Sequence, residues 1–318
     1  MATEDLPQDL KANIDRLRVQ GSSILDSFLN ENIRVQPIPQ IVYHYTDWNG
    51  LRGILDDGTL RCGDIFYLND PSELRHGVSA SLDLFRAGNA LSDWGRFGED
   101  LKRSLSSNLG QIANIFILCF SQKWDDLSQW RAYGENGRGY AIGFDGRAIE
   151  SAFAKEFALQ AQTFPITYSD DKLTALHQKL IDFVETLMIS HQRPDVDSAQ
   201  RILYYKMLRF EFSVLVLSAS LFFKHEAYDT ESEYRFLQMH RVGPVSGVKF
   251  RKDKPNNLAR YREFNWKASA PNSLKSIVVG PAADFGKAQR FADDCLKAFL
   301  PSQRSVAIER SKIPYSPQ

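Results

Sequence analysis

Three polar residues, His44, Tyr45 and Thr46, stand at the end of an apolar segment that begins at Ile41. On a β-strand, His44 and Thr46 would point to one face and Tyr45 to the other. Imidazole and hydroxyl groups both donate and accept hydrogen bonds, which suits paired ribose hydroxyls. The structural alternative is a histidine at a strand end whose ring bonds to a backbone carbonyl. This segment alone favours the structural alternative.

Two glutamates occur in an alternating segment later in the chain, where Glu231, Glu233 and Arg235 share one face. Tyr234 and Phe236 occupy the other face, which belongs on the core, so the carboxylates should face water or a cleft. Two carboxylates at a cleft can cleave a glycosidic bond: one stabilises an oxocarbenium-like centre and the other orients or deprotonates a nucleophile. The alternative is an exposed strand with a Glu–Arg pair, which contributes under about 1 kcal/mol.

Tyr67 precedes an Asn69-Asp70-Pro71 turn. An aromatic ring beside such a turn can stack on a planar ligand, but Asn-Asp-Pro is also ordinary turn and cap chemistry. The structural interpretation is favoured for this pair of features.

Ser121 ends the strongest buried-strand signal, an apolar run that begins at Asn114. Trp130 and Tyr133 follow, three residues apart on one face of a short predicted helix. These residues could form a pocket wall, although we expect Trp130 to pack in the core. Ser121 lacks a Gly-x-Ser-x-Gly elbow, which argues against a serine hydrolase.

The composition is that of a globular protein: 318 residues, 43% hydrophobic, with a formal net charge of zero. Neutrality removes the simplest argument for a nucleic-acid partner, although a local basic face remains open. The three cysteines are widely spaced, so we expect reduced thiols, no disulfide framework and no metal site. The N-terminus does not resemble a signal peptide, and the longest apolar stretch is interrupted by Glu211. We therefore expect a cytoplasmic protein with no membrane partner.

The elements that must position these residues alternate between helices and strands. We predict an α+β fold with a mixed, mainly antiparallel sheet, an N-terminal helical extension over 1–36, and a single domain over 37–318 with a helical insertion at about 170–225. Helices are expected at 5–31, 71–85, 92–109, 125–133, 146–158, 171–192, 197–223 and 284–299, besides a short one that ends at Gly58. Strands are expected at 41–46, from 59, at 114–121, 139–145, 163–168, 233–237, 248–252, 260–266 and 276–279.

The order of these motifs resembles a widespread bacterial family that is described only as a domain of unknown function. The resemblance runs from about residue 41 to 300. It rests on His44-Tyr45-Thr46, Asn69-Asp70-Pro71, Cys119-Phe120-Ser121, Trp130 with Tyr133, Gly139 with Gly143-Phe144-Asp145, Glu231-x-Glu233-x-Arg235 and Gly280-Pro281.

The first segment is also similar to the first strand and helix of ADP-ribosyltransferase folds. That resemblance implies a sheet of ADP-ribosyltransferase type, with NAD as substrate and His44 holding the adenosine-side ribose. It implies an aromatic residue beside nicotinamide, either Tyr67 or Tyr133, and Glu233 as the catalytic carboxylate. Glu231-x-Glu233 is similar to the paired-glutamate motif of the protein-modifying branch, whose Ser-Thr-Ser motif this chain lacks.

Three hypotheses follow. The first is an NAD-consuming ADP-ribosyltransferase-like enzyme, a bacterial toxin or phage-defence effector that modifies a protein or nucleic acid. Its catalytic residues would be Glu233 and Glu231, with His44, Tyr45, Thr46, Tyr67, Asn69, Ser121 and Tyr133 in the binding site. The second is a nucleotide- or nucleic-acid-binding sensor on the same fold, without turnover. The third is a protein-interaction scaffold. The acceptor cannot be carried over from the resemblance.

Overall fold

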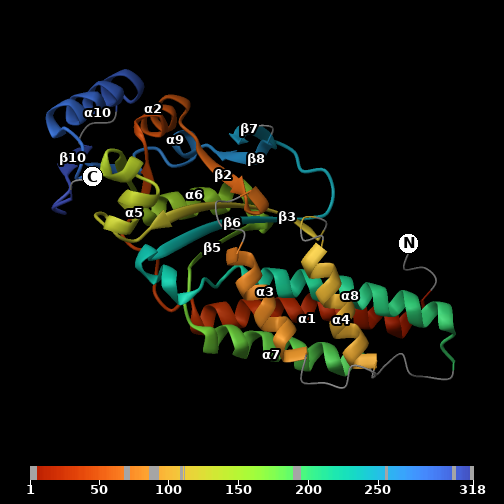
Figure 1. The fold of residues 1–318 in the computed structure, drawn as a ribbon. Helices are drawn as coiled ribbons and strands as arrows, with labels where there is room; N and C mark the ends of the chain where they lie inside the picture. Colours follow the sequence, from red (N-terminus) through yellow and green to blue (C-terminus); the bar gives the residue numbers. More distant parts are fainter. Residues whose placement is uncertain are drawn as a thin grey trace. The chain divides into compact units, whose positions relative to one another are not determined.

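Contacts between residues divide the computed structural model into two compact units, here called the helical unit and the sheet unit (Figure 1). The helical unit comprises Met1–Val35, Asn69–Asn114 and Thr167–Glu226, and the sheet unit comprises Gln36–Leu68, Ile115–Ile166 and Ala227–Gln318. The structure describes residues 6–67, 72–85, 93–107, 110, 112–188, 195–254, 257–302 and 306–315.

The helical unit is a set of packed helices whose apolar residues recur at helical spacing. In the first helix, Leu10, Ile14 and Leu17 are buried along one side, as the 3.6-residue period requires. Its last long helix begins at a capping box formed by Asp197 and Gln200, which satisfies backbone donors at that end. The helices are α1 (Gln8–Asn32), α3 (Ser72–Phe85), α4 (Asp93–Ser107), α7 (Asp170–Met188) and α8 (Ser198–Ser220).

The sheet unit contains a ten-stranded sheet within the described residues, in the order β10-β9-β4-β1-β3-β2-β8-β7, with β6 pairing β3 and β5. The strand pairs β1–β3, β1–β4, β2–β3, β2–β8, β4–β9, β5–β6 and β7–β8 are antiparallel, and β10 pairs with β9 in parallel. The strands are β1 (Ile41–Thr46), β2 (Leu60–Asp64), β3 (Ala113–Ser121), β4 (Tyr140–Asp145), β5 (Ala161–Pro165), β6 (Glu233–Arg241), β7 (Lys249–Lys254), β8 (Asn257–Phe264), β9 (Leu274–Val279) and β10 (Ala307–Arg310).

Four helices of the sheet unit, α2, α6, α9 and α10, contribute buried or partly buried residues to the main core on one side of the strands, whereas Trp130 of α5 packs with Tyr45 on the other side. Trp48 of α2 and Phe291 of α10 meet edge to face at 6.2 Å, and the two helices lie side by side in Figure 1. The α-helices are α2 (Trp48–Asp57), α5 (Leu127–Ala132), α6 (Gly146–Phe157), α9 (Trp266–Ser269) and α10 (Phe285–Phe299). The 3₁₀ helices are η2 (Ile65–Tyr67), η4 (Glu135–Gly137), η5 (Ala158–Gln160) and η7 (Glu226–Glu231).

The turn between β1 and β2 follows from its sequence. Asp47 accepts a hydrogen bond from the Gly50 amide and so caps the start of α2. Gly58 ends the helix with φ at 69°, a left-handed conformation that glycine adopts without steric cost. The chain therefore reverses at Gly58 and enters β2, as the sequence predicted.

The mixed fold and the mainly antiparallel sheet predicted from the sequence are confirmed, whereas the ADP-ribosyltransferase type stays a prediction. The predicted 1–36 extension and 170–225 insertion both contribute to the helical unit, together with Asn69–Asn114; the predicted division into domains stays a prediction. The strand expected at 163–168 lies at Ala161–Pro165, and β10 was not predicted. No described helix has the length and apolar character needed to cross a membrane.

Candidate functional site

His44 lies where β1 and β3 diverge. Tyr43 and Ser121 are the one pair in register between these strands, both of which are fully described. Beyond that pair, His44 Nδ1 lies 3.1 Å from the carbonyl oxygen of Cys119. Because a carbonyl only accepts, Nδ1 must carry the hydrogen, and Nε2 is left as an acceptor. Burial lowers the pKa of His44, and the bond to Cys119 opposes that effect without cancelling it. The ring is therefore neutral near pH 7.

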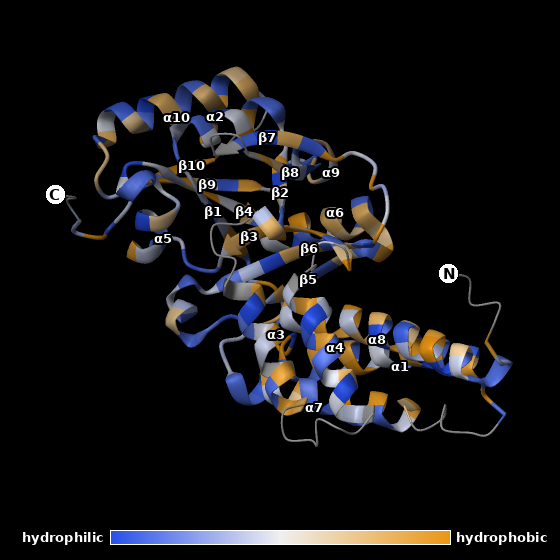
Figure 2. Cartoon of the chain, turned by 45° about the vertical axis from the view of Figure 1, so that its right-hand side comes forward, coloured by the Kyte–Doolittle hydropathy of each residue, from blue (hydrophilic) through white to orange (hydrophobic). Residues whose placement is uncertain are grey.

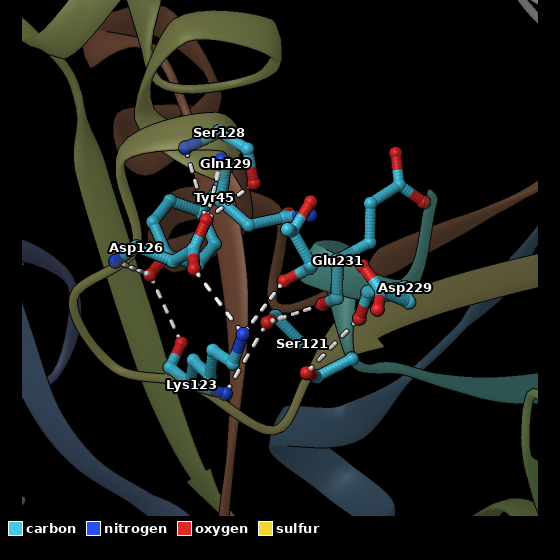
Figure 3. A network of polar contacts seen from close by, with 10 residues as sticks. Tyr45, Ser121, Lys123, Asp126, Ser128, Gln129, Asp229 and Glu231 are labelled. Atoms are coloured by element: carbon cyan, nitrogen blue, oxygen red, sulfur yellow. Dashed lines mark hydrogen bonds and ion pairs between the residues drawn. The ribbon is translucent and has the colours of Figure 1, made fainter. Parts of the chain in front are cut away.

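Tyr45, on the other face of β1, is tied into a network of polar contacts (Figure 3). Its hydroxyl donates to the Lys123 carbonyl at 2.9 Å and accepts from the Asp126 amide at 3.2 Å. Its ring packs edge to face on Trp130, 4.8 Å away. Burial of Tyr45 raises the pKa of its hydroxyl, so this group remains a neutral hydrogen-bonding bridge. This junction network comprises Tyr45, Ser121, Lys123, Asp126 and Glu231.

Ser121 joins the end of β3 to the glutamate segment. Its hydroxyl donates to the backbone carbonyl of Glu231 at 2.9 Å and accepts from the Lys123 amide at 3.2 Å. The Gln122 amide also donates to the Ser232 carbonyl at 2.9 Å. Residues about 110 positions apart are thereby fixed side by side, as Figure 3 shows for Ser121 and Glu231.

Asp126 organises the rest of the junction network. Its carboxylate accepts from the amides of Ser128 and Gln129 and caps α5. Asp126 Oδ2 lies 3.4 Å from Lys123 Nζ, and Lys123 Nζ also donates to the carbonyl oxygen of Thr230 at 3.0 Å. Burial alone would raise the pKa of Asp126, but the hydrogen bonds from Ser128 and Gln129, with the charge of Lys123, hold it below its ordinary value.

Glu231 and Glu233 do not share a strand, contrary to the alternation predicted from the sequence. Glu231 ends η7, and Ser232 follows with φ at 45°, so the pattern is broken before β6 begins at Glu233. Glu231 is partly exposed, whereas Glu233 is buried. The two carboxylates therefore occupy different environments.

Glu233 forms a buried, bidentate ion pair with Arg235. The guanidinium donates from Nε at 2.7 Å and from Nη2 at 3.2 Å. The side chains are 6% and 2% exposed, respectively. The sequence predicted that these charges would face water or a cleft; they are instead withdrawn from solvent and neutralise each other.

His44 and Glu233 point to opposite faces of the sheet. The His44 ring contacts Phe120, and Phe120 contacts Phe236 with ring centroids 5.0 Å apart, so these three share a face. Glu233 and Phe236 are three positions apart on one strand and therefore face opposite ways. The structure brings the segments that carry His44 and Glu233 together, but not their side chains.

The remaining predicted site residues do not form one cluster, since Tyr67 follows β2 towards the end of β3 that is opposite to Ser121. Thr46 is partly buried at the end of β1, on the face of His44. Tyr133 is the C-terminal cap of α5 rather than a residue on its face, and it is 42% exposed. Tyr67 ends η2 and is 37% exposed, and Asn69 lies outside the described residues. Trp130 is fully buried, as expected.

The sequence did not point to Lys123 or Asp126, although both hold the junction network together. The sequence signal for Asp126 is its position three residues before Gln129, which is typical of a residue that caps the start of a helix. All three cysteines are free, and the described residues contain no group of three metal-binding side chains.

Part of the chain is recognised by comparison with known families. Residues 129–236 match the family described as "Protein of unknown function (DUF2971)". The matched segment covers about a third of the chain and includes Trp130, Tyr133, Glu231 and Glu233. It is narrower than the 41–300 span that the motif order suggested, and His44 lies outside it. No curated protein and no solved structure matches the chain.

Proposed function

We propose that this chain is an NAD-consuming enzyme of ADP-ribosyltransferase type that modifies a macromolecule. The observation that carries the proposal is the hydrogen bond from His44 Nδ1 to Cys119. It fixes the tautomer and orientation of a partly buried imidazole and leaves Nε2 as an acceptor where two strands diverge. A preoriented acceptor of this kind suits a ribose hydroxyl, which must donate one hydrogen bond to be held.

In this proposal Glu231, rather than Glu233, supplies the catalytic carboxylate. Its backbone is anchored by Ser121, and its side chain is partly exposed, so it can approach a ligand. Glu233 has a structural role in this proposal, because Arg235 already neutralises the charge of its carboxylate. The bond between nicotinamide and ribose breaks, and nicotinamide leaves with the electron pair. The carboxylate of Glu231 stabilises the positive charge on the sugar, and an acceptor nucleophile then bonds to the anomeric carbon and loses its proton to water. Of the two candidate aromatic residues, Tyr133 is 42% exposed and is the one proposed to contact nicotinamide, because Tyr67 lies towards the other end of β3.

The test is nicotinamide release from NAD by the full chain, followed by chromatography. Replacing Glu231 with Gln should lower the rate about 100-fold or more. Replacing His44 with Ala should chiefly raise KM, because His44 binds the substrate. Glu226→Gln is the matched control, since Glu226 is exposed on the same η7 and has no role in the proposal. Equal rates for wild type and Glu231→Gln would refute the assignment.

A second function is nucleotide binding without turnover. The neutralised carboxylate of Glu233 faces away from His44, so catalysis would rest on Glu231 alone, and a chain in which Glu231 does not reach the ligand would have no catalytic carboxylate. The same fold would then bind a nucleotide without consuming it. This alternative expects a rise in melting temperature with NAD and no nicotinamide release. Neither a thermal shift nor release would exclude both functions.

A further inference from the structure

The β7–β8 hairpin at the end of the sheet order is strongly basic. Residues 249–264 contain six Lys or Arg and two Asp or Glu, in a chain whose formal net charge is zero. One of the two carboxylates, Glu263, pairs with Lys249 at 2.7 Å. Arg251 and Lys252 are exposed, and no ion pair among the described residues involves them. The local excess of positive charge therefore remains open to solvent.

Apolar side chains lie among these cations. Phe250 is 60% exposed and Leu258 is 58% exposed, which is unusual for large side chains on a sheet. The register pairs Phe250 with Arg260 and Lys252 with Leu258, so these four residues share one face. Figure 2 shows the resulting alternation of hydrophilic and hydrophobic colour along β7.

Arginines on this face are held in fixed orientations. Arg260 is bound by the buried carboxylate of Asp64 at 2.6 Å and remains 29% exposed. Arg262, two positions along β8, donates to Gln238 at 2.5 Å. Such anchoring lowers the entropic cost of binding an anion, because the guanidinium groups are ordered beforehand.

We propose that the β7–β8 hairpin binds single-stranded nucleic acid. Phosphates would contact Lys252 and Arg260, and a base would stack on the ring of Phe250, which is exposed on the same face. An exposed aromatic ring between cations favours a single strand over an acidic peptide, because every base offers a flat face for stacking whereas acidic side chains offer none. The surface is separate from the proposed NAD site, so it does not depend on NAD consumption.

The test uses fluorescence anisotropy of the full chain with labelled single-stranded DNA and RNA of mixed sequence, about 20 nucleotides long. Replacing Lys252 with Ala should weaken binding about 3-fold or more at low salt. It should also reduce the slope of log K against log salt by about 0.7, the contribution of one phosphate contact on a single strand. The matched control is Lys287→Ala on the exposed surface of α10.

Variants at Phe250 test the contribution of base stacking without changing the charge of the hairpin. Phe250→Ala and Phe250→Leu should both weaken binding about 5-fold or more, while Phe250→Trp should preserve it. Full affinity in Phe250→Leu would overturn the stacking step. Three further results would overturn the proposal: no binding by the wild type at low salt, equal loss in the α10 control, or equal affinity for duplex DNA or polyglutamate. Melting curves of all variants check that each remains folded.

Discussion

At the junction of β1, β3 and β6, polar side chains bond to one another or to backbone groups, whereas the β7–β8 hairpin also carries exposed cations such as Arg251 and Lys252. Ser121 and Tyr45 each make two hydrogen bonds inside the junction. Arg251 and Lys252 make no ion pair within the described chain. The residue types that suggest catalysis in the sequence are largely occupied by structural bonds. The surface with unused charge carries no recognisable catalytic motif.

The largest effect should come from breaking the buried pair at the start of β6. Arg235→Met leaves the carboxylate of Glu233 buried without its cation, so we expect a loss of about 3–5 kcal/mol in the free energy of unfolding. Denaturant titration measures this loss. A change below about 1 kcal/mol would mean that the pair is solvated and that Glu233 is available for chemistry.

His177 is a buried residue of the helical unit whose ring nitrogens have no hydrogen-bond partner among the described residues. Burial lowers its pKa from 6.5 to about 3. The unfolded chain therefore binds a proton that the folded chain does not, so stability falls as pH drops from about 6.5 towards 3. Between pH 7 and pH 5 the loss from this group is about 2 kcal/mol.

Thermal melts at pH 7 and pH 5 test the role of His177. The His177→Leu variant should lose less stability at pH 5 than the wild type, whereas the exposed His225→Gln control should behave like the wild type. Equal acid sensitivity in wild type and His177→Leu would contradict the prediction.

A smaller effect is expected from a single hydroxyl of the junction network. Tyr45→Phe removes the bridge between the Lys123 carbonyl and the Asp126 amide, at a cost of about 1 kcal/mol or more. The double variant with Ser121→Ala should lose less than the sum of the single changes, because both hydroxyls fix Lys123. Tyr67→Phe, on an exposed ring, serves as the control. Strict additivity would show that the two hydroxyls act independently.

The smallest effect belongs to the exposed pair on the hairpin. Replacing Lys249 with Met breaks its contact with Glu263, but solvent screens both charges, so the melting temperature should not change measurably. A clear fall in melting temperature would show that this exposed ion pair stabilises the fold, as the polar contacts of the junction are expected to do.

Local structure was predictable where the sequence carries a local physical signal. The apolar run before Ser121 gave β3, and Gly58 marked the end of α2 because its left-handed conformation favours glycine. The structural alternative for His44, a bond to a backbone carbonyl, is the geometry observed. By contrast, the alternation around Glu233 predicted exposure, because charged side chains are ordinarily buried only when paired.

Whether a charge is paired and covered depends on distant segments. The residues next to Glu233 in the sequence carry no signal that the Glu233–Arg235 pair is buried. Likewise β10 is short and polar and forms only by parallel pairing with β9, so its own residues carry a weak strand signal. The joining of Ser121 to Glu231 is also a long-range contact that local periodicity does not encode.

The single registered pair of Tyr43 and Ser121 has a mechanical consequence. Between β1 and β3 the sheet has one registered pair instead of a ladder, and two side-chain bonds add to it: His44 reaches Cys119, and Tyr45 reaches Lys123. These side chains therefore do part of the work that backbone hydrogen bonds do between other strands. A substitution at His44 consequently alters the joining of two strands as well as the candidate site.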